Sequence, residues 1–101
     1  MDKTQMLNLA ETFESSLNND LRALQAALGQ HDPDPVIRLL HSLKGYVTFL
    51  SRDELTSQII ELESVSRQHE LDFVRAKVMQ VMPSLEQLLS EVSRWKSVEL
   101  S

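Results

Sequence analysis

The sequence predicts an all-α fold, an antiparallel up-down four-helix bundle. Its apolar residues recur every three or four positions, which is the spacing of one helix face, and no stretch alternates as a strand does. Breaks at residues 29–35, 51–54 and 68–70 divide the chain into four amphipathic segments. Short connections make consecutive helices antiparallel, so that each buries its apolar stripe against the others. With 101 residues, we expect one domain spanning residues 1–101.

The first two segments carry apolar stripes between clear boundary residues. Gly29 follows the first segment and is expected to take the left-handed cap position that ends many helices. Asp34 is the expected N-cap of the second helix, with Pro35 at its first position, where a missing N–H costs nothing. The first stripe consists of Met6, Ala10, Phe13, Leu17, Leu21, Leu24 and Leu28. The second consists of Val36, Leu40, Leu43, Val47 and Leu50, flanked by Leu39 and Tyr46.

The last two segments are amphipathic as well. Ser51 and Glu54 have the spacing of a capping box, which predicts that a third helix starts directly after the second. Pro83 lies inside the fourth stripe, and we expect a kink there rather than a break, because the stripe continues in register on both sides. Trp95 is expected to close the core. The third stripe is Leu55, Ile59, Leu62 and Val65. The fourth is Leu71, Val74, Val78, Val81, Leu85, Leu88, Val92 and Trp95.

The composition argues against several classes of function. Without cysteine, the chain has no disulfide, thiolate metal site or cysteine nucleophile. Its 15 acidic and 10 basic residues, a net charge of −5, argue against nucleic acid or an anionic membrane as partner. No apolar run approaches the roughly 18 residues of a membrane span, and the N-terminus lacks a signal-peptide pattern. We therefore expect a cytoplasmic protein that needs no cofactor or metal. We also expect a monomer, because the four apolar stripes can bury one another within one chain.

Three residues of the second segment stand out because core packing does not require them. His41 falls about 150° from the centre of the buried stripe, so its side chain is expected to face solvent. Lys44, three residues later, places an ammonium group within reach of a negative charge arriving at the imidazole ring. Gly45 is unusual, because glycine inside a helix costs roughly 0.5–1 kcal/mol relative to alanine. It leaves the backbone bare one turn from His41 and clears space for another molecule.

This outward face has the groups that a phosphocarrier needs. A neutral imidazole nitrogen is a competent nucleophile, and imidazole is largely neutral at cytosolic pH. Ile37 adds an apolar element, and with Arg38 and Thr48 it is expected to form the surface on which a partner docks. No carboxylates are expected to converge on His41 to bind magnesium, so the partner supplies the metal. We therefore predict a phosphocarrier that accepts its phosphoryl group from another macromolecule, and not an enzyme.

The run of residues 41–45, HSLKG, resembles the H-x-x-K-G signature of histidine phosphotransfer (HPt) domains. At the level of pattern, the resemblance extends from the first segment to Trp95. It implies that His41 is phosphorylated, that Lys44 steadies the phosphoryl group and that Gly45 is kept bare for the partner. It further implies a relay between aspartates of response-regulator receiver domains in a multistep two-component phosphorelay, downstream of a hybrid sensor histidine kinase.

Other residues are expected to have ordinary structural roles. The family commonly has small residues where this chain has Tyr46, Val47 and Phe49, and a glycine where it has Ser51. We expect Phe49 to be partly buried against a neighbouring loop. Surface positions are expected for His31 and His69, and a solvated helix face for Glu61 and Glu63. Core or flank positions are expected for Met6, Met79 and Met82.

Two other functions fit the sequence less well. A non-phosphorylated adaptor could bind a receiver or a partner helix through the same face, in which case His41 would be dispensable. An ATP-dependent kinase or a hydrolase would need a nucleotide loop, a metal constellation or a nucleophile–base pair, and the sequence offers none of these.

Overall fold

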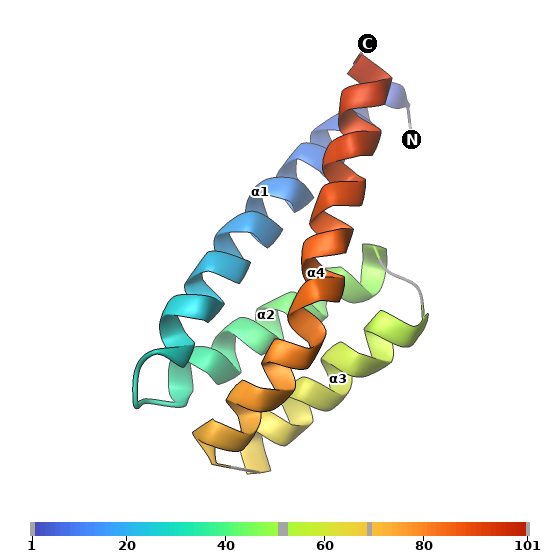
Figure 1. Ribbon diagram of the computed structural model, residues 1–101. Coiled ribbons are helices and arrows are strands. Elements are labelled where there is room, and N and C mark those ends of the chain that lie inside the picture. Colours follow the sequence, from blue (N-terminus) through green and yellow to red (C-terminus); the bar gives the residue numbers. More distant parts are fainter. Residues whose placement is uncertain (1, 51–52, 69, 101) are drawn as a thin grey trace.

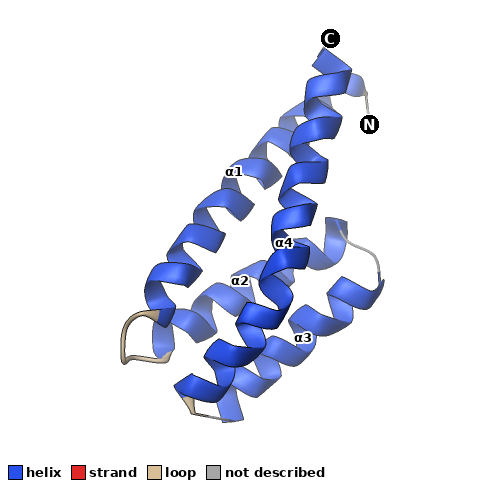
Figure 2. Ribbon diagram, viewed as in Figure 1, coloured by secondary structure: helices blue, strands red, loops and turns tan. Residues whose placement is uncertain are grey.

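The computed structural model describes residues 2–50, 53–68 and 70–100, and this part of the chain consists of four helices and short connections (Figures 1 and 2). The helices are α1 (Lys3–Leu28), α2 (Asp34–Leu50), α3 (Asp53–Gln68) and α4 (Leu71–Leu100). Each packs on its neighbours in the order α1–α2–α3–α4, and α4 closes the ring against α1. Figure 1 shows each helix running opposite to the next. The predicted antiparallel up-down four-helix bundle is confirmed.

The core is formed by the predicted apolar stripes, and α2 is held most completely by it. Val36, Leu40, Leu43 and Val47 of α2 are each no more than 1% exposed. Burying these four side chains fixes the rotation of α2 about its axis, since they lie on one face of the helix. The opposite face of α2 therefore points to solvent. Further core residues come from the other helices: Leu17, Leu21 and Leu24 from α1, Ile59 and Leu62 from α3, and Val74, Val78, Val81, Leu85 and Leu88 from α4.

The N-terminus of α2 differs by one residue from the prediction. The amide of Ile37 donates to the carbonyl oxygen of Pro33 at 3.0 Å, so Asp34 already lies in the first helical turn and is not the N-cap. The capping side chain is instead that of Asp32, whose Oδ1 accepts from the amide of Asp34 at 3.1 Å. A carboxylate two residues earlier can satisfy this amide, and the Asp34 carboxylate still interacts favourably with the positive end of the helix dipole.

The C-terminus of α1 also differs from the prediction. Gly29 has φ −81° and ψ −8°, which is right-handed, so the expected left-handed cap is wrong. The last turn tightens instead, because the amide of Gly29 donates to the carbonyl of Ala26 at 3.1 Å. Arg75 of α4 adds a cap from another helix, since its Nε donates to the carbonyl of Leu28 at 2.9 Å. With a guanidinium on that carbonyl, no left-handed residue is needed.

Helix α4 is continuous through Pro83, as expected, and Figure 1 shows its axis bending about halfway along. Helix α3 begins at Asp53 and ends at Gln68. The predictions for Ser51, for the Leu50 side chain and for His69 fall outside the described residues and side chains.

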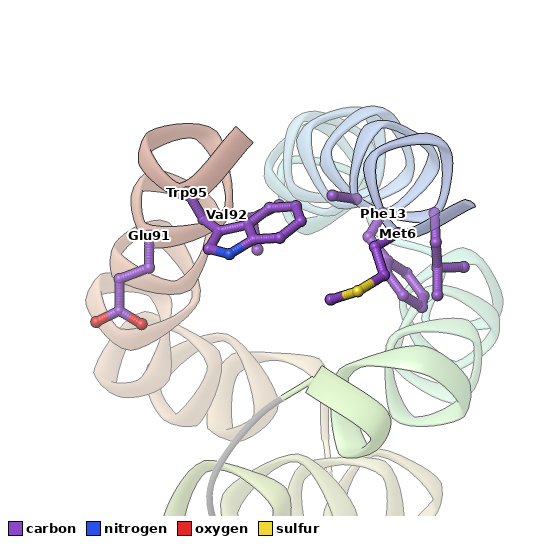
Figure 3. Close-up of a pocket in the computed structure, with 7 residues that line it drawn as sticks. Met6, Phe13, Glu91, Val92 and Trp95 are labelled. Atoms are coloured by element: carbon purple, nitrogen blue, oxygen red, sulfur yellow. The ribbon is translucent and has the colours of Figure 1, made fainter. Parts of the chain in front are cut away.

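Helices α1 and α4 extend beyond the two shorter helices as a two-helix arm that carries both termini (Figure 1). Because neither α2 nor α3 extends along the arm, an apolar groove of about 310 Å³ stays open between α1 and α4. Figure 3 shows Trp95 of α4 lying across this groove toward Met6 and Phe13 of α1. Trp95 is therefore a half-buried groove wall and does not close the core as predicted. Met6 is 44% exposed, so it is not a core residue either.

Two more apolar side chains are more exposed than predicted. Phe49, at the end of α2 next to the arm, is 79% exposed, so the expected partial burial is wrong. Its ring meets only the edge of the arm, tilted against Phe13 with 6.5 Å between centroids. Met79 is also exposed, whereas Met82 is buried as expected. Phe49 follows the buried Val47 by two positions, so its side chain lies on the side of α2 that faces away from the core.

Candidate functional site

The outer face of α2 brings together the three residues that the sequence singled out. The side chain of His41 is 64% exposed, and Lys44 is partly exposed one turn further along the helix. Gly45 is exposed, and a Cβ added to it would meet nothing within 4 Å. The outward direction of His41 and the bare backbone at Gly45 follow from the burial of the opposite face of α2.

A buried carboxylate from α3 lies beneath this face. Glu63 has only 7% of its side chain exposed, and its Oε1 lies 2.8 Å from Nδ1 of His41. Its Oε2 lies 2.5 Å from Nζ of Lys44, and Arg67 Nη2 donates to Oε1 at 3.1 Å. We call His41, Lys44, Glu63 and Arg67 the Glu63 cluster. It ties α2 to α3 directly below the exposed edge of the histidine ring.

The position of Glu63 corrects two predictions. Glu61 is exposed as expected, but Glu63 is buried and does not belong to a solvated face. One carboxylate does meet His41, although none was expected there. The sequence holds a signal for this, because Glu63 lies four residues after Ile59 of the predicted third stripe. Residues three and four apart share a helix face, so Glu63 lies on the flank of the buried stripe.

The charges around Glu63 keep its carboxylate ionised. The hydrogen bond from Lys44 is the largest cause that lowers its pKa, followed by the one from His41. Burial acts in the opposite direction, and Arg67 adds a further lowering contribution. Together they move the pKa of Glu63 from an ordinary value of 4.5 to about 2. At neutral pH the carboxylate is therefore charged and accepts hydrogen bonds from three side chains.

Acidification is expected to weaken the bundle through Glu63. A carboxyl group whose pKa is lower in the folded state stabilises the fold above its unfolded pKa, and this contribution is lost as the pH falls toward the folded pKa. Between pH 7 and pH 3 we expect the wild-type protein to lose about 2 kcal/mol of unfolding free energy from this group. Urea denaturation at both pH values measures the loss.

Matched variants isolate this contribution. Glu63→Gln should lose this part of the acid dependence, whereas the exposed Glu61→Gln should keep it. Glu14, whose pKa is lowered by Lys96 and Ser93, is present in every variant, so its effect cancels. Equal acid dependence in Glu63→Gln and the wild type would contradict the assignment.

The predicted docking residues share the face with His41 to different degrees. Arg38 is exposed and Ile37 is half-buried, so both are available at the surface of α2. Thr48 is half-buried, and its hydroxyl donates to the carbonyl oxygen of Lys44 at 2.7 Å, which leaves mainly its methyl group for a partner. Ile60 on α3, three positions before Glu63, is a 49% exposed apolar residue that was not among the predicted docking residues.

The flank of α2 that faces α1 is held by Tyr46. Its hydroxyl donates to Oδ2 of Asp20 at 2.7 Å, and its ring stacks on Phe13 with 6.2 Å between centroids. Burial is the main cause that raises the pKa of Tyr46, and the hydrogen bond to Asp20 adds to it. The phenol therefore stays protonated and keeps donating. These contacts anchor α2 on the side away from the Glu63 cluster.

Neither metal binding nor membrane insertion has a visible basis in the described part of the chain. Over residues 2–50, 53–68 and 70–100, no three His, Cys, Asp or Glu side chains are grouped so that they could hold a metal ion. None of the helices in these ranges combines the length and the apolar character that crossing a membrane requires. His31 is exposed in the connection between α1 and α2.

The fold and the site together define a four-helix bundle that exposes a histidine beside a lysine and a bare glycine backbone. The family model described as Hpt domain matches residues 8–95, which is most of the chain, and the protein belongs to this family. Hpt domains are helical bundles that act as phosphocarriers rather than enzymes. Membership supports a histidine phosphotransfer role in two-component phosphorelay signalling and implies interaction with response-regulator receiver domains. Comparisons with curated proteins and with solved structures gave no match.

Proposed function

We propose that the protein relays a phosphoryl group between the aspartates of two receiver domains, with His41 as the intermediate carrier. In the proposed donation step, a lone pair on His41 attacks phosphorus, a P–N bond forms, and the P–O bond of the donor aspartyl phosphate breaks. The aspartate leaves as a carboxylate. The donor in this proposal is the receiver domain of a hybrid sensor histidine kinase.

The exposure of His41 is the observation that carries the proposal. In-line attack requires that the ring project outward and that the donor dock above it. The side chain of His41 is 64% exposed, and the missing side chain of Gly45 leaves open space one turn away. A docked receiver can therefore bring its aspartate to the ring without displacing any part of α2.

Charge on this face supports the choice of partner. Lys44 and Arg67 both bind the carboxylate that contacts His41, and Arg38 is exposed three residues before His41 on α2, although the whole chain has a net charge of −5. The Lys44 ammonium has three donors, of which one engages Glu63, so others remain for a phosphoryl oxygen. Ile37 and Thr48 provide an apolar border for docking. A locally positive face on an acidic domain suits the carboxylates and phosphate of a receiver active site.

Phosphotransfer from a receiver tests the function. The protein is incubated with a receiver domain charged with radiolabelled acetyl phosphate in the presence of magnesium. Label is expected on this protein, stable in alkali and labile in acid, within the peptide that contains residue 41. A receiver whose phosphorylated aspartate is replaced by asparagine serves as the control. Label that is stable in acid, or that maps to another peptide, would rule out His41 as the carrier.

Lys44→Ala is expected to slow transfer by about tenfold, because one cation that neutralises the phosphoryl group is lost while Arg67 remains. The variant should also lose about 1 kcal/mol of stability, because Glu63 loses its shortest ion pair. Rapid-quench transfer assays and urea denaturation measure the two effects. Lys77→Ala on α4 is the control, since its ammonium lies over the Phe73 ring instead. A wild-type transfer rate in Lys44→Ala would exclude the role of this ammonium.

A further inference from the structure

Glu63 is placed where it decides which ring nitrogen of His41 carries a proton. Its Oε1 lies 2.8 Å from Nδ1, and the cations of Lys44 and Arg67 bind the same carboxylate. A carboxylate held by two cations stays ionised, and an ionised carboxylate can only accept hydrogen bonds. Nδ1 must therefore be the protonated donor. The lone pair is on Nε2, at the opposite and exposed edge of the ring.

The Nδ1 proton gains importance once Nε2 carries a phosphoryl group. A phosphorylated ring that keeps this proton has a positive charge. When the next aspartate oxygen attacks phosphorus, the P–N bond breaks and its electron pair returns to Nε2, which releases a neutral imidazole. A ring that has lost the Nδ1 proton would have to leave as an imidazolate anion, which is a much poorer leaving group. Onward transfer is therefore faster from the protonated ring.

Within residues 2–50, 53–68 and 70–100, the charged groups on the helices packed around the ring come from α1, α2 and α3. Glu63 and Arg67 face it from α3, while Lys44 and Arg38 lie on α2 itself. Helix α1, the other helix packed on α2, contributes Asp20, but that carboxylate is engaged by the Tyr46 hydroxyl at 2.7 Å. Glu63 is thus the carboxylate in contact with Nδ1. Because the Glu63 side chain is buried, water has little access to this hydrogen bond.

We propose that Glu63 is a positioning residue that holds the proton on Nδ1 of His41 in both the free and the phosphorylated state, so that the phosphoryl group always leaves from the protonated ring and releases a neutral imidazole. This inference rests on the proposed phosphotransfer through His41. Its consequence is a rate of onward transfer that stays nearly constant over the pH range in which an unassisted phosphohistidine ring loses its proton.

Glu63→Gln tests the inference, because glutamine keeps the size of the side chain and removes its charge. The amide can accept from a protonated Nδ1 or donate to a bare one, so it no longer favours either form. Onward transfer from phosphorylated Glu63→Gln should fall by about tenfold relative to the wild type between pH 6.5 and pH 8.5. Using the same receiver for both proteins cancels the pH response of the receiver. Glu61→Gln, the exposed glutamate on the same helix, should follow the wild type.

A measurement on the wild-type protein tests the inference even if Glu63→Gln does not fold. In protein with ¹⁵N-labelled histidine, NMR should find the His41 proton on Nδ1 before phosphorylation and still there at pH 8.5 afterwards. A wild-type phosphohistidine that loses this proton below pH 7.5, or parallel pH profiles for Glu63→Gln and the wild type, would overturn the inference. Failure of the proposed function looks different, because then no phosphoryl group from a receiver reaches His41 in the wild type.

Discussion

Replacing His41 with glutamine is expected to abolish phosphoryl transfer, with no label above background after incubation with a phosphorylated receiver. Glutamine offers no nucleophilic nitrogen, so no P–N bond can form at this position. The fold should remain intact, because the side chain is 64% exposed and the glutamine amide can donate to Glu63 in place of Nδ1. We expect the unfolding free energy to stay within about 1 kcal/mol of the wild type. Autoradiography and urea denaturation measure the two properties.

The chain provides a matched control for this variant. His31 is an exposed histidine in the connection between α1 and α2, so His31→Gln makes the same chemical change away from the candidate site. It should accept label like the wild type. Full labelling of His41→Gln would exclude His41 as the carrier, and unchanged partner signalling by that variant would favour the non-phosphorylated adaptor.

Replacing Gly45 with glutamine is expected to move activity and stability in opposite directions. Glycine in a helix interior is less favourable than most residues, and no atom lies within 4 Å of an added Cβ, so stability should rise by about 0.5–1 kcal/mol. Transfer should fall by about a hundredfold, because a long side chain one turn from His41 keeps the docked aspartate from the ring. The transfer rate of Gly45→Ala should lie between those of the wild type and Gly45→Gln. Thermal melts and single-turnover transfer assays measure these effects.

The other glycine of the chain serves as the control. Gly29 has an ordinary right-handed backbone conformation, and an added Cβ would meet only the Ala26 carbonyl oxygen, at 3.4 Å. Gly29→Ala should therefore leave transfer unchanged. If Gly45→Gln transferred at the wild-type rate, Gly45 would have no role in clearing space for a partner. A loss of stability in that variant would point instead to a packing role for this glycine.

The fold was predictable because helical periodicity is a local property. The stripe of α2 placed Leu40 and Leu43 in the core, and the same periodicity placed His41 and Gly45 on the outer face. The helix ends were less predictable. The cap expected from Asp34 is provided by the Asp32 carboxylate, which lies two residues earlier in the chain. At the end of α1, where Gly29 was the expected cap, the guanidinium of Arg75 on α4 binds the last carbonyl.

The errors in the predicted core share one physical cause. Periodicity reports which residues lie on one face of a helix, but it does not report whether another helix covers that face. Met6 and Trp95 continue the stripes of α1 and α4 beyond the point where α2 and α3 end. They consequently line an open groove.

Residue spacing alone predicts four amphipathic helices, their order, and the surface row of His41, Lys44 and Gly45, because each of these depends on residues a few positions apart. The position of Glu63 beneath this row is visible only in the three-dimensional structure. Glu63 and His41 are 22 positions apart on different helices, and only the packing of α3 on α2 brings the carboxylate within 2.8 Å of the ring. Contact between helices depends on their length and relative placement, which a repeat of three or four residues does not specify.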